Sequence, residues 1–199
     1  MKDDVITRVL EAFKRLPGVG ERTARRFLFY LLERDRTVLS ELAESLKDLD
    51  RGAIPCSICH LIDTVSPCSI CSSQNREPII CVVSSSREAY AIESTGTYKG
   101  KYHVLGGLVS PVEGVNPEDL FISDLKDRVK NEKIEEVIIA LPSNTEGEIT
   151  AHYIANLLRD TGVKITLLAR GLSYGADLEY TDPMTIERAL NYRVPYEKK

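Results

Sequence analysis

Four of the five cysteines form two pairs with the spacing of a metal-binding motif. The pairs are Cys56 with Cys59 and Cys68 with Cys71, which gives the pattern C-x2-C-x8-C-x2-C. Two such pairs can place four thiolates tetrahedrally around one Zn²⁺ at about 2.3 Å each. Four protein ligands leave no open position, so the pattern predicts one structural zinc ion per chain. Redox chemistry through C-x-x-C is the alternative, but a duplicated pair joined by a loop that contains Pro67 favours a closed metal site.

A helix-stopping turn stands directly before a cluster of arginines at residues 16–26, LPGVGERTARR. Apolar residues recur at helical spacing over 5–13 and again over 24–32, which predicts two helices joined by this turn. Gly18 and Gly20 permit the positive φ values and the close backbone approach that a tight turn needs. We expect the second helix to begin near Glu21, where its unpaired N–H groups and its dipole can bind a phosphate.

Arg22, Arg25 and Arg26 lie in the first turn and a half of this second helix, where positive charge opposes the helix dipole. A nucleic-acid phosphate would offset that cost, because arginines add charge-assisted hydrogen bonds and release counterions. The stretch therefore predicts a DNA-binding site that comprises Gly18, Gly20 and the three arginines. A plain helical hairpin with a solvated basic face is the alternative.

Two glutamates, Glu146 and Glu148, flank a glycine at a predicted junction between a loop and a helix. Carboxylates in such a place can hold a hard cation such as Mg²⁺. The alternative is that they are helix-start carboxylates, which the helix dipole favours.

The elements that must position these residues alternate between strand and helix after the cysteines. Short apolar strands are predicted at 78–83, 101–105, 137–141 and 163–169. Helices are predicted at 38–49 and, between or after the strands, near 87–95, 123–132, 147–161 and beyond 182–183. This alternation indicates an α/β fold with a parallel sheet that is covered on both faces. Ligand sites in such sheets gather at the carboxyl ends of the strands, which here lead into residues 84–88 and 143–148.

Three further residues that could do chemistry are expected to be structural. Cys81 lies within an apolar run and is interpreted as a core residue. His103 lies in a strand and is interpreted as a buried, hydrogen-bonded residue. His60 follows Cys59 directly, but four thiolates leave it surplus as a ligand.

Charge is distributed unevenly along the 199 residues. The formal net charge is −4, yet residues 1–36 hold nine Lys/Arg against six Asp/Glu, a net charge of +3, and residues 37–199 hold 17 against 24, a net charge of −7. A polyanion should therefore meet the N-terminal part, whereas the acidic remainder would repel it or face protein partners.

Composition and hydropathy indicate an ordinary globular protein, with 43% hydrophobic and 28% charged residues. No apolar run approaches the roughly 18–20 residues that span a bilayer, and the N-terminus lacks the apolar core of a signal peptide. We therefore expect a cytoplasmic protein with no membrane partner.

The order of these parts closely resembles the RecR family of bacterial recombination mediators along essentially the whole chain. The resemblance rests on LPGVGERTARR, the four-cysteine pattern, GKYHVLGGLVSPVEGV at 100–115, EGE at 146–148 and ARGLSYGADLEYTD at 169–182. It implies four segments: a helix-hairpin-helix region at 1–53, a zinc finger at 54–75, a Toprim-like α/β domain at 76–172 and a C-terminal strand-helix segment at 173–199 that contacts another subunit.

The resemblance also implies a function. The family binds DNA, forms ring-shaped tetramers, and works with RecO and RecF to help RecA replace single-strand-binding protein at gaps. Carried over by position, Arg22 and Arg26 look like its DNA-contacting residues, and the four paired cysteines look like its zinc ligands.

One position departs from the family pattern. Where the family commonly has Val-Glu after the first Toprim strand, this chain has Val83 and Ser84, which leaves Glu146 and Glu148 as the acidic set, for Mg²⁺ or for partner docking. A Toprim nuclease or topoisomerase-like activity is the alternative to a non-catalytic mediator. Because two-metal chemistry needs several carboxylates at one strand edge, the serine favours the mediator, with no catalytic residue.

Overall fold

The computed structural model describes residues 4–33, 36–169, 171–172 and 175–195. The chain forms two compact units, Met1–Ala53 and Ile54–Lys199, which are described separately below. None of the helices in the described ranges combines the length and the apolar character that a membrane crossing requires.

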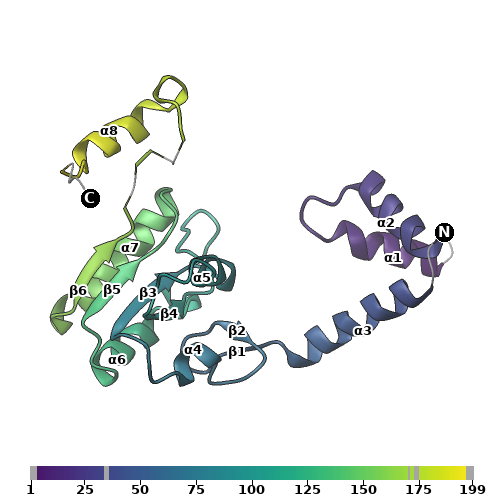
Figure 1. The fold of residues 1–199 in the computed structure, drawn as a ribbon, viewed down its shortest axis with the longest axis horizontal. Helices are drawn as coiled ribbons and strands as arrows, with labels where there is room; N and C mark the ends of the chain where they lie inside the picture. Colours follow the sequence, from purple (N-terminus) through teal and green to yellow (C-terminus); the bar gives the residue numbers. More distant parts are fainter. Residues whose placement is uncertain (1–3, 34–35, 170, 173–174, 196–199) are drawn as a thin grey trace. The chain divides into compact units, whose positions relative to one another are not determined.

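The first unit consists of three helices: α1 (Val5–Lys14), α2 (Glu21–Glu33) and α3 (Arg36–Gly52), drawn in purple and blue in Figure 1. Helices α1 and α2 pack together, and Phe13 meets Phe27 edge to face with ring centroids 6.0 Å apart. Ala24, Leu28 and Leu31 are buried on α2. The predicted helical hairpin is therefore confirmed.

Helix α3 includes the predicted helix at 38–49 and carries a row of exposed apolar side chains. None of the residues described in α3 is buried. The row consists of Val38, Leu39, Leu42, Leu46 and Leu49.

The second unit is built on a four-stranded, fully parallel sheet in the order β4-β3-β5-β6. The strands are β3 (Ile79–Val83), β4 (Lys101–Val104), β5 (Glu136–Ile139) and β6 (Lys164–Leu167). All four lie within the predicted ranges or one residue outside them, so the predicted α/β class is confirmed.

Alternate residues of the strands enter two different cores. Ile80, Val82 and Val137 pack with residues of α6 (Ser123–Asn131) and α7 (Thr145–Leu158). On the opposite face, Cys81 and Val83 pack with α5 (Ser86–Glu93) and with the cysteine-rich segment that precedes the sheet. That segment contains β1 (Ile54–Pro55), β2 (Ile62–Asp63) and α4 (Ser69–Ser72), and β1 pairs antiparallel with β2.

The C-terminal part contains the expected helix, and its described residues contain no strand. Residues 175–195 contain a 3-10 turn, η3 (Leu178–Tyr180), and helix α8 (Pro183–Asn191). The Thr181 hydroxyl donates a hydrogen bond to the Asp177 carbonyl at 2.9 Å, and Asp182 caps α8 directly afterwards, so these described residues turn where a strand was expected. Within the stretch 169–182, residues 170 and 173–174 lie outside the described residues.

Helix α7 begins at Thr145, two residues before the predicted start, because the Asn144 side chain caps it by accepting a hydrogen bond from the Gly147 N–H at 2.9 Å. The backbone passes very close to Gly147 here. A Cβ at this position would lie 2.0 Å from the Pro142 carbonyl oxygen. The glycine between Glu146 and Glu148 is therefore required by packing.

We expect Gly147→Ala to lower the free energy of unfolding by about 1–3 kcal/mol or more, because the new methyl group must displace backbone. Urea denaturation measures the change. Gly52→Ala is the control, since a Cβ there meets no atom within 4 Å. Equal stability of Gly147→Ala and the unaltered protein would contradict the close approach.

Candidate functional site

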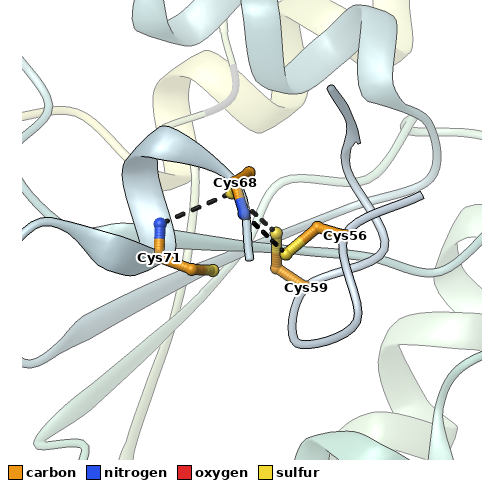
Figure 2. Close-up of side chains that lie close together, drawn as sticks. All are labelled: Cys56, Cys59, Cys68 and Cys71. Atoms are coloured by element: carbon orange, nitrogen blue, oxygen red, sulfur yellow. Dashed lines mark hydrogen bonds between the residues drawn. The ribbon is translucent and has the colours of Figure 1, made fainter. Parts of the chain in front are cut away.

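The four paired cysteines converge, as the sequence predicts. Their sulfur atoms all lie within 4.8 Å of one another, and the Sγ atoms of Cys59 and Cys68 are 3.6 Å apart (Figure 2). Sulfur atoms bound tetrahedrally at 2.3 Å would be separated by about 3.8 Å. All four thiols are free of disulfides. Among the described residues, this is the only group of three or more Cys, His, Asp or Glu placed to hold a metal ion.

Backbone N–H groups donate hydrogen bonds to the sulfurs, as they do in sites where cysteines bind a metal as thiolates. The N–H groups of Ile58 and Cys68 donate to the Cys56 Sγ at 3.4 and 3.3 Å. Cys68 is the N-cap of α4, and its Sγ accepts from the Cys71 N–H at 3.4 Å. Such donors stabilise negative charge on sulfur, which is the form that binds a metal.

Two charged or polar neighbours complete the surroundings of the cysteines. The Arg128 Nη2 lies 3.9 Å from the Cys71 Sγ. The hydrogen bond from Cys59, together with the Arg128 guanidinium, lowers the pKa of Cys71 and so favours its thiolate. His60 is not among the converging ligands, as expected: its Nε2 lies 3.1 Å from the Asp124 Oδ2, and its ring stacks on Phe121 at 3.8 Å.

The cysteine cluster shares one core with the sheet. Cys56, Cys59 and Cys68 are fully buried in the same cluster as Val83 and Tyr102. The Val104 N–H also donates to the Cys59 carbonyl at 2.8 Å. The four converging cysteines are therefore part of the layer that covers this face of the sheet.

The structural interpretations of Cys81 and His103 are confirmed. Cys81 is 2% exposed, and burial raises its pKa to about 12. His103 is fully buried, and desolvation lowers its pKa to about 4, so the ring is neutral at pH 7. Its Nε2 donates to the Phe121 carbonyl at 2.6 Å, which leaves Nδ1 as an acceptor facing Arg128 at 3.5 Å.

The turn between α1 and α2 carries the predicted glycines in two different conformations. The Val19 N–H donates to the Leu16 carbonyl at 3.1 Å, and Gly18 has a φ of 77°, as in a type II turn with proline in second place. Gly20 lacks the positive φ that was expected. The Gly20 carbonyl accepts a hydrogen bond from the Ala24 N–H at 2.9 Å, so Gly20 is the residue that precedes the first turn of α2. A Cβ at either glycine would meet nothing within 4 Å, which leaves the turn accessible.

The three predicted arginines are exposed but not equivalent. Arg25 Nε donates to Glu21 Oε1 at 2.8 Å, and Lys14 Nζ lies 3.2 Å from the other oxygen of the same carboxylate. Within the described residues, Arg22 and Arg26 form no ion pair. They are therefore the two guanidinium groups available to an anion. Lys14 was missed from the sequence, although a helical hairpin brings the last turn of α1 to the first turn of α2.

Glu146 and Glu148 face different cavities. Glu146 shares a cavity of about 620 Å³ with Glu113 and Asp119, beyond the carboxyl ends of the strands. Glu148 lines a cavity of about 570 Å³ together with Arg188 of α8, whose Nη2 lies 2.8 Å from its Oε1. The structure therefore does not bring the two carboxylates together.

A third carboxylate, which the sequence analysis left out of the acidic set, lies at the end of β3. Glu88 accepts hydrogen bonds from the Ser84 N–H at 2.7 Å, the Ser84 hydroxyl at 2.8 Å and the Ser85 N–H at 3.2 Å. The spacing of Ser85 and Glu88 is that of a capping box, which was the available signal. Glu88 is thus engaged in starting α5.

Comparisons with known proteins agree with this architecture. Three family models match: RecR, helix-hairpin-helix, at residues 6–49; Toprim domain, at residues 79–169; and RecR, C-terminal, at residues 171–194. Three similar curated proteins are each named Recombination protein RecR. The one from Staphylococcus haemolyticus is 42% identical over 93% of this chain and 94% of its own length. Those from Trichlorobacter lovleyi and Herpetosiphon aurantiacus are 43% and 44% identical, each over 94% of this chain and over 95% and 93% of their own lengths.

We expect Cys68→Ser to lose its bound metal and also to lower the stability of the whole second unit. The second effect is expected because the cysteines and the sheet residues share one hydrophobic core. Elemental analysis and thermal unfolding test both effects. Cys81→Ser is the control for metal binding, because it alters a buried thiol in the same core that is not one of the four converging sulfurs, and it should keep the metal. If the unaltered protein is purified without metal and is fully stable, the proposal that the four cysteines bind a metal is wrong.

Proposed function

The chain belongs to the RecR family of recombination proteins, and we propose that it is a DNA-binding mediator of recombinational repair that carries out no catalysis of its own. The observation that carries the proposal is the turn at Gly18, followed by the exposed guanidinium groups of Arg22 and Arg26, which form no ion pair with any residue that the structure describes.

DNA binding at this turn follows from its chemistry. The open backbone at Gly18 and Gly20 lets a phosphate approach the first N–H groups of α2, where the helix dipole favours negative charge. Arg22 and Arg26 add charge-assisted hydrogen bonds to the same or the neighbouring phosphate. These contacts reach the nucleic-acid backbone and carry no base information, which suits a protein that acts at gaps of any sequence.

We infer that the metal is zinc, one ion per chain, with a structural role. Four thiolates are soft ligands that select Zn²⁺ or iron-sulfur centres, and a closed tetrahedral set leaves no position for substrate. The position of the cysteines in the core of the second unit supports a folding role rather than a catalytic one.

The proposal also covers the assembly of the protein and its protein partners. We propose a tetrameric ring that works with RecO and RecF to help RecA replace single-strand-binding protein on gapped DNA. The exposed apolar row of α3 supports assembly, since subunit contact would remove it from water, and residues 173–199 are proposed as a further subunit contact. The negative charge of residues 37–199 suits protein partners rather than DNA.

The proposal of no catalysis rests on how the carboxylates are used. Two-metal phosphoryl chemistry needs several carboxylates around the same ions. Here Glu88 caps α5, and Glu148 pairs with Arg188. Glu146 shares its cavity with Glu113 and Asp119, but among the described residues these three carboxylates do not converge closely enough to hold one metal ion. Within the described residues, the Glu146 carboxylate has no hydrogen bond or ion pair, so it is the one that we propose for partner docking.

We expect Arg22→Ala combined with Arg26→Ala to weaken binding to all duplex sequences alike. The plot of log affinity against log salt should become less steep by about 0.9 for each lost phosphate contact. Fluorescence anisotropy over a salt series measures both quantities. Lys47→Ala combined with Arg51→Ala removes the same charge from exposed positions on α3 and should change the slope little. An equal effect of both double variants would show that overall charge, and not the turn, binds DNA.

We expect supercoiled plasmid to remain intact when the protein is added with Mg²⁺ or Mn²⁺, and Glu146→Ala to weaken the capture of RecO in a pull-down. Glu135→Ala is the control, because it removes the same charge from an exposed position just before β5, at the amino end of that strand, whereas Glu146 follows its carboxyl end. Nicking or relaxation that disappears in Glu146→Ala would overturn the non-catalytic proposal. Unchanged RecO capture would overturn the docking role of Glu146.

A further inference from the structure

Arg128 is a buried cation whose guanidinium reaches three parts of the second unit. Its side chain is only 5% exposed, and it extends from α6 toward the cysteines. Nε donates to the Glu132 Oε1 at 2.6 Å, and Nη1 donates to the Tyr102 carbonyl on β4. Nη2 lies 3.9 Å from the Cys71 Sγ. Burying a positive charge costs desolvation free energy unless hydrogen bonds and a negative partner compensate for the lost water.

The negative charge of a thiolate centre gives this cation a partner. Four thiolates around one divalent ion carry a net charge of −2, and three of the four cysteines are fully buried. The charge of Glu132 is not enough to neutralise Arg128, because the same carboxylate is shared with Lys101, whose Nζ lies 2.6 Å from its other oxygen. Among the described residues, Arg128 is the only Lys or Arg whose side chain lies within hydrogen-bonding distance of one of the four sulfurs. The Nη edge of the guanidinium is thus directed at Cys71 and at the backbone of β4.

We propose that Arg128 is a positioning residue of the metal centre: it compensates the charge of the thiolates and fixes Cys71 against the sheet. The inference rests on the proposed metal site. It adds that a residue from α6, in a distant part of the sequence, determines how tightly that site holds its ion. Outer-shell partners of this kind typically contribute 10–100-fold to metal affinity.

The test compares full-length Arg128→Met and Arg128→Lys with the unaltered protein by chelator competition for Zn²⁺. We expect Arg128→Met to bind zinc about 10–100-fold more weakly. Arg128→Lys should recover part of the loss, since lysine restores the charge but not the planar fork that reaches acceptors on α6, on β4 and in the cysteine segment at once. Arg76→Met is the matched control: Arg76 is likewise mostly buried and paired with a glutamate, Glu93, and it contacts none of the four cysteine sulfurs.

A spectroscopic measurement separates positioning of the thiolate from general destabilisation. In the Co²⁺-substituted protein, the sulfur-to-cobalt charge-transfer band of Arg128→Met should shift to lower energy, because the thiolate electrons are no longer stabilised by the cation. The band of Arg76→Met should not move. Wild-type zinc affinity in a folded Arg128→Met would overturn the inference. If that variant does not fold, wild-type affinity and an unshifted band in Arg128→Lys would do so. Absence of metal from the unaltered protein would instead overturn the metal site itself.

Discussion

The packing of the cysteine-rich segment on the sheet is the contact on which the second unit depends. An α/β sheet needs apolar cover on both faces, and here one face is covered by α6 and α7. The other face meets α5 and the residues between β1 and α4, with Cys56, Cys59 and Leu61 in the same cluster as Val83 and Tyr102. A segment too short to form a core of its own thereby becomes half of a larger one.

The same contact explains why unusual side chains are buried around it. His103, His60 and Arg128 lie where α6, β4 and the cysteine segment meet, and each finds a partner there: a carbonyl, a carboxylate or a sulfur. The neutral state of His103 keeps further positive charge out of the junction. The His60 ring stacks on Phe121 beside it. Polar residues at this junction thus hold separate elements in one arrangement.

Local patterns in the sequence were sufficient for most of the fold and for the clustering of the cysteines. Helix and strand periods, the Asp182-Pro183 start and the repeated C-x2-C are all local signals, and the elements lie within a few residues of the predictions. Contacts between distant residues gave no such signal. The approach of Arg128 to Cys71 cannot be read from spacing. The separation of Glu146 from Glu148 can be, once both residues are placed in the first turn of α7, because residues two apart on a helix face different directions. The difference among the three exposed arginines depends on Glu21, which pairs with Arg25 at the local i,i+4 spacing, whereas Arg22 and Arg26 form no ion pair within the described residues.

The two units also differ in when they can fold during synthesis. The contacts of α1 with α2 join neighbouring parts of the chain, so the first unit can form as soon as it leaves the ribosome. The cysteine segment must wait, because its core includes Val83, Tyr102 and Ala140, which are made later. Until those residues emerge, the four thiols lack the apolar cover of the native site. An ion bound early would therefore hold the segment together before the sheet exists to receive it.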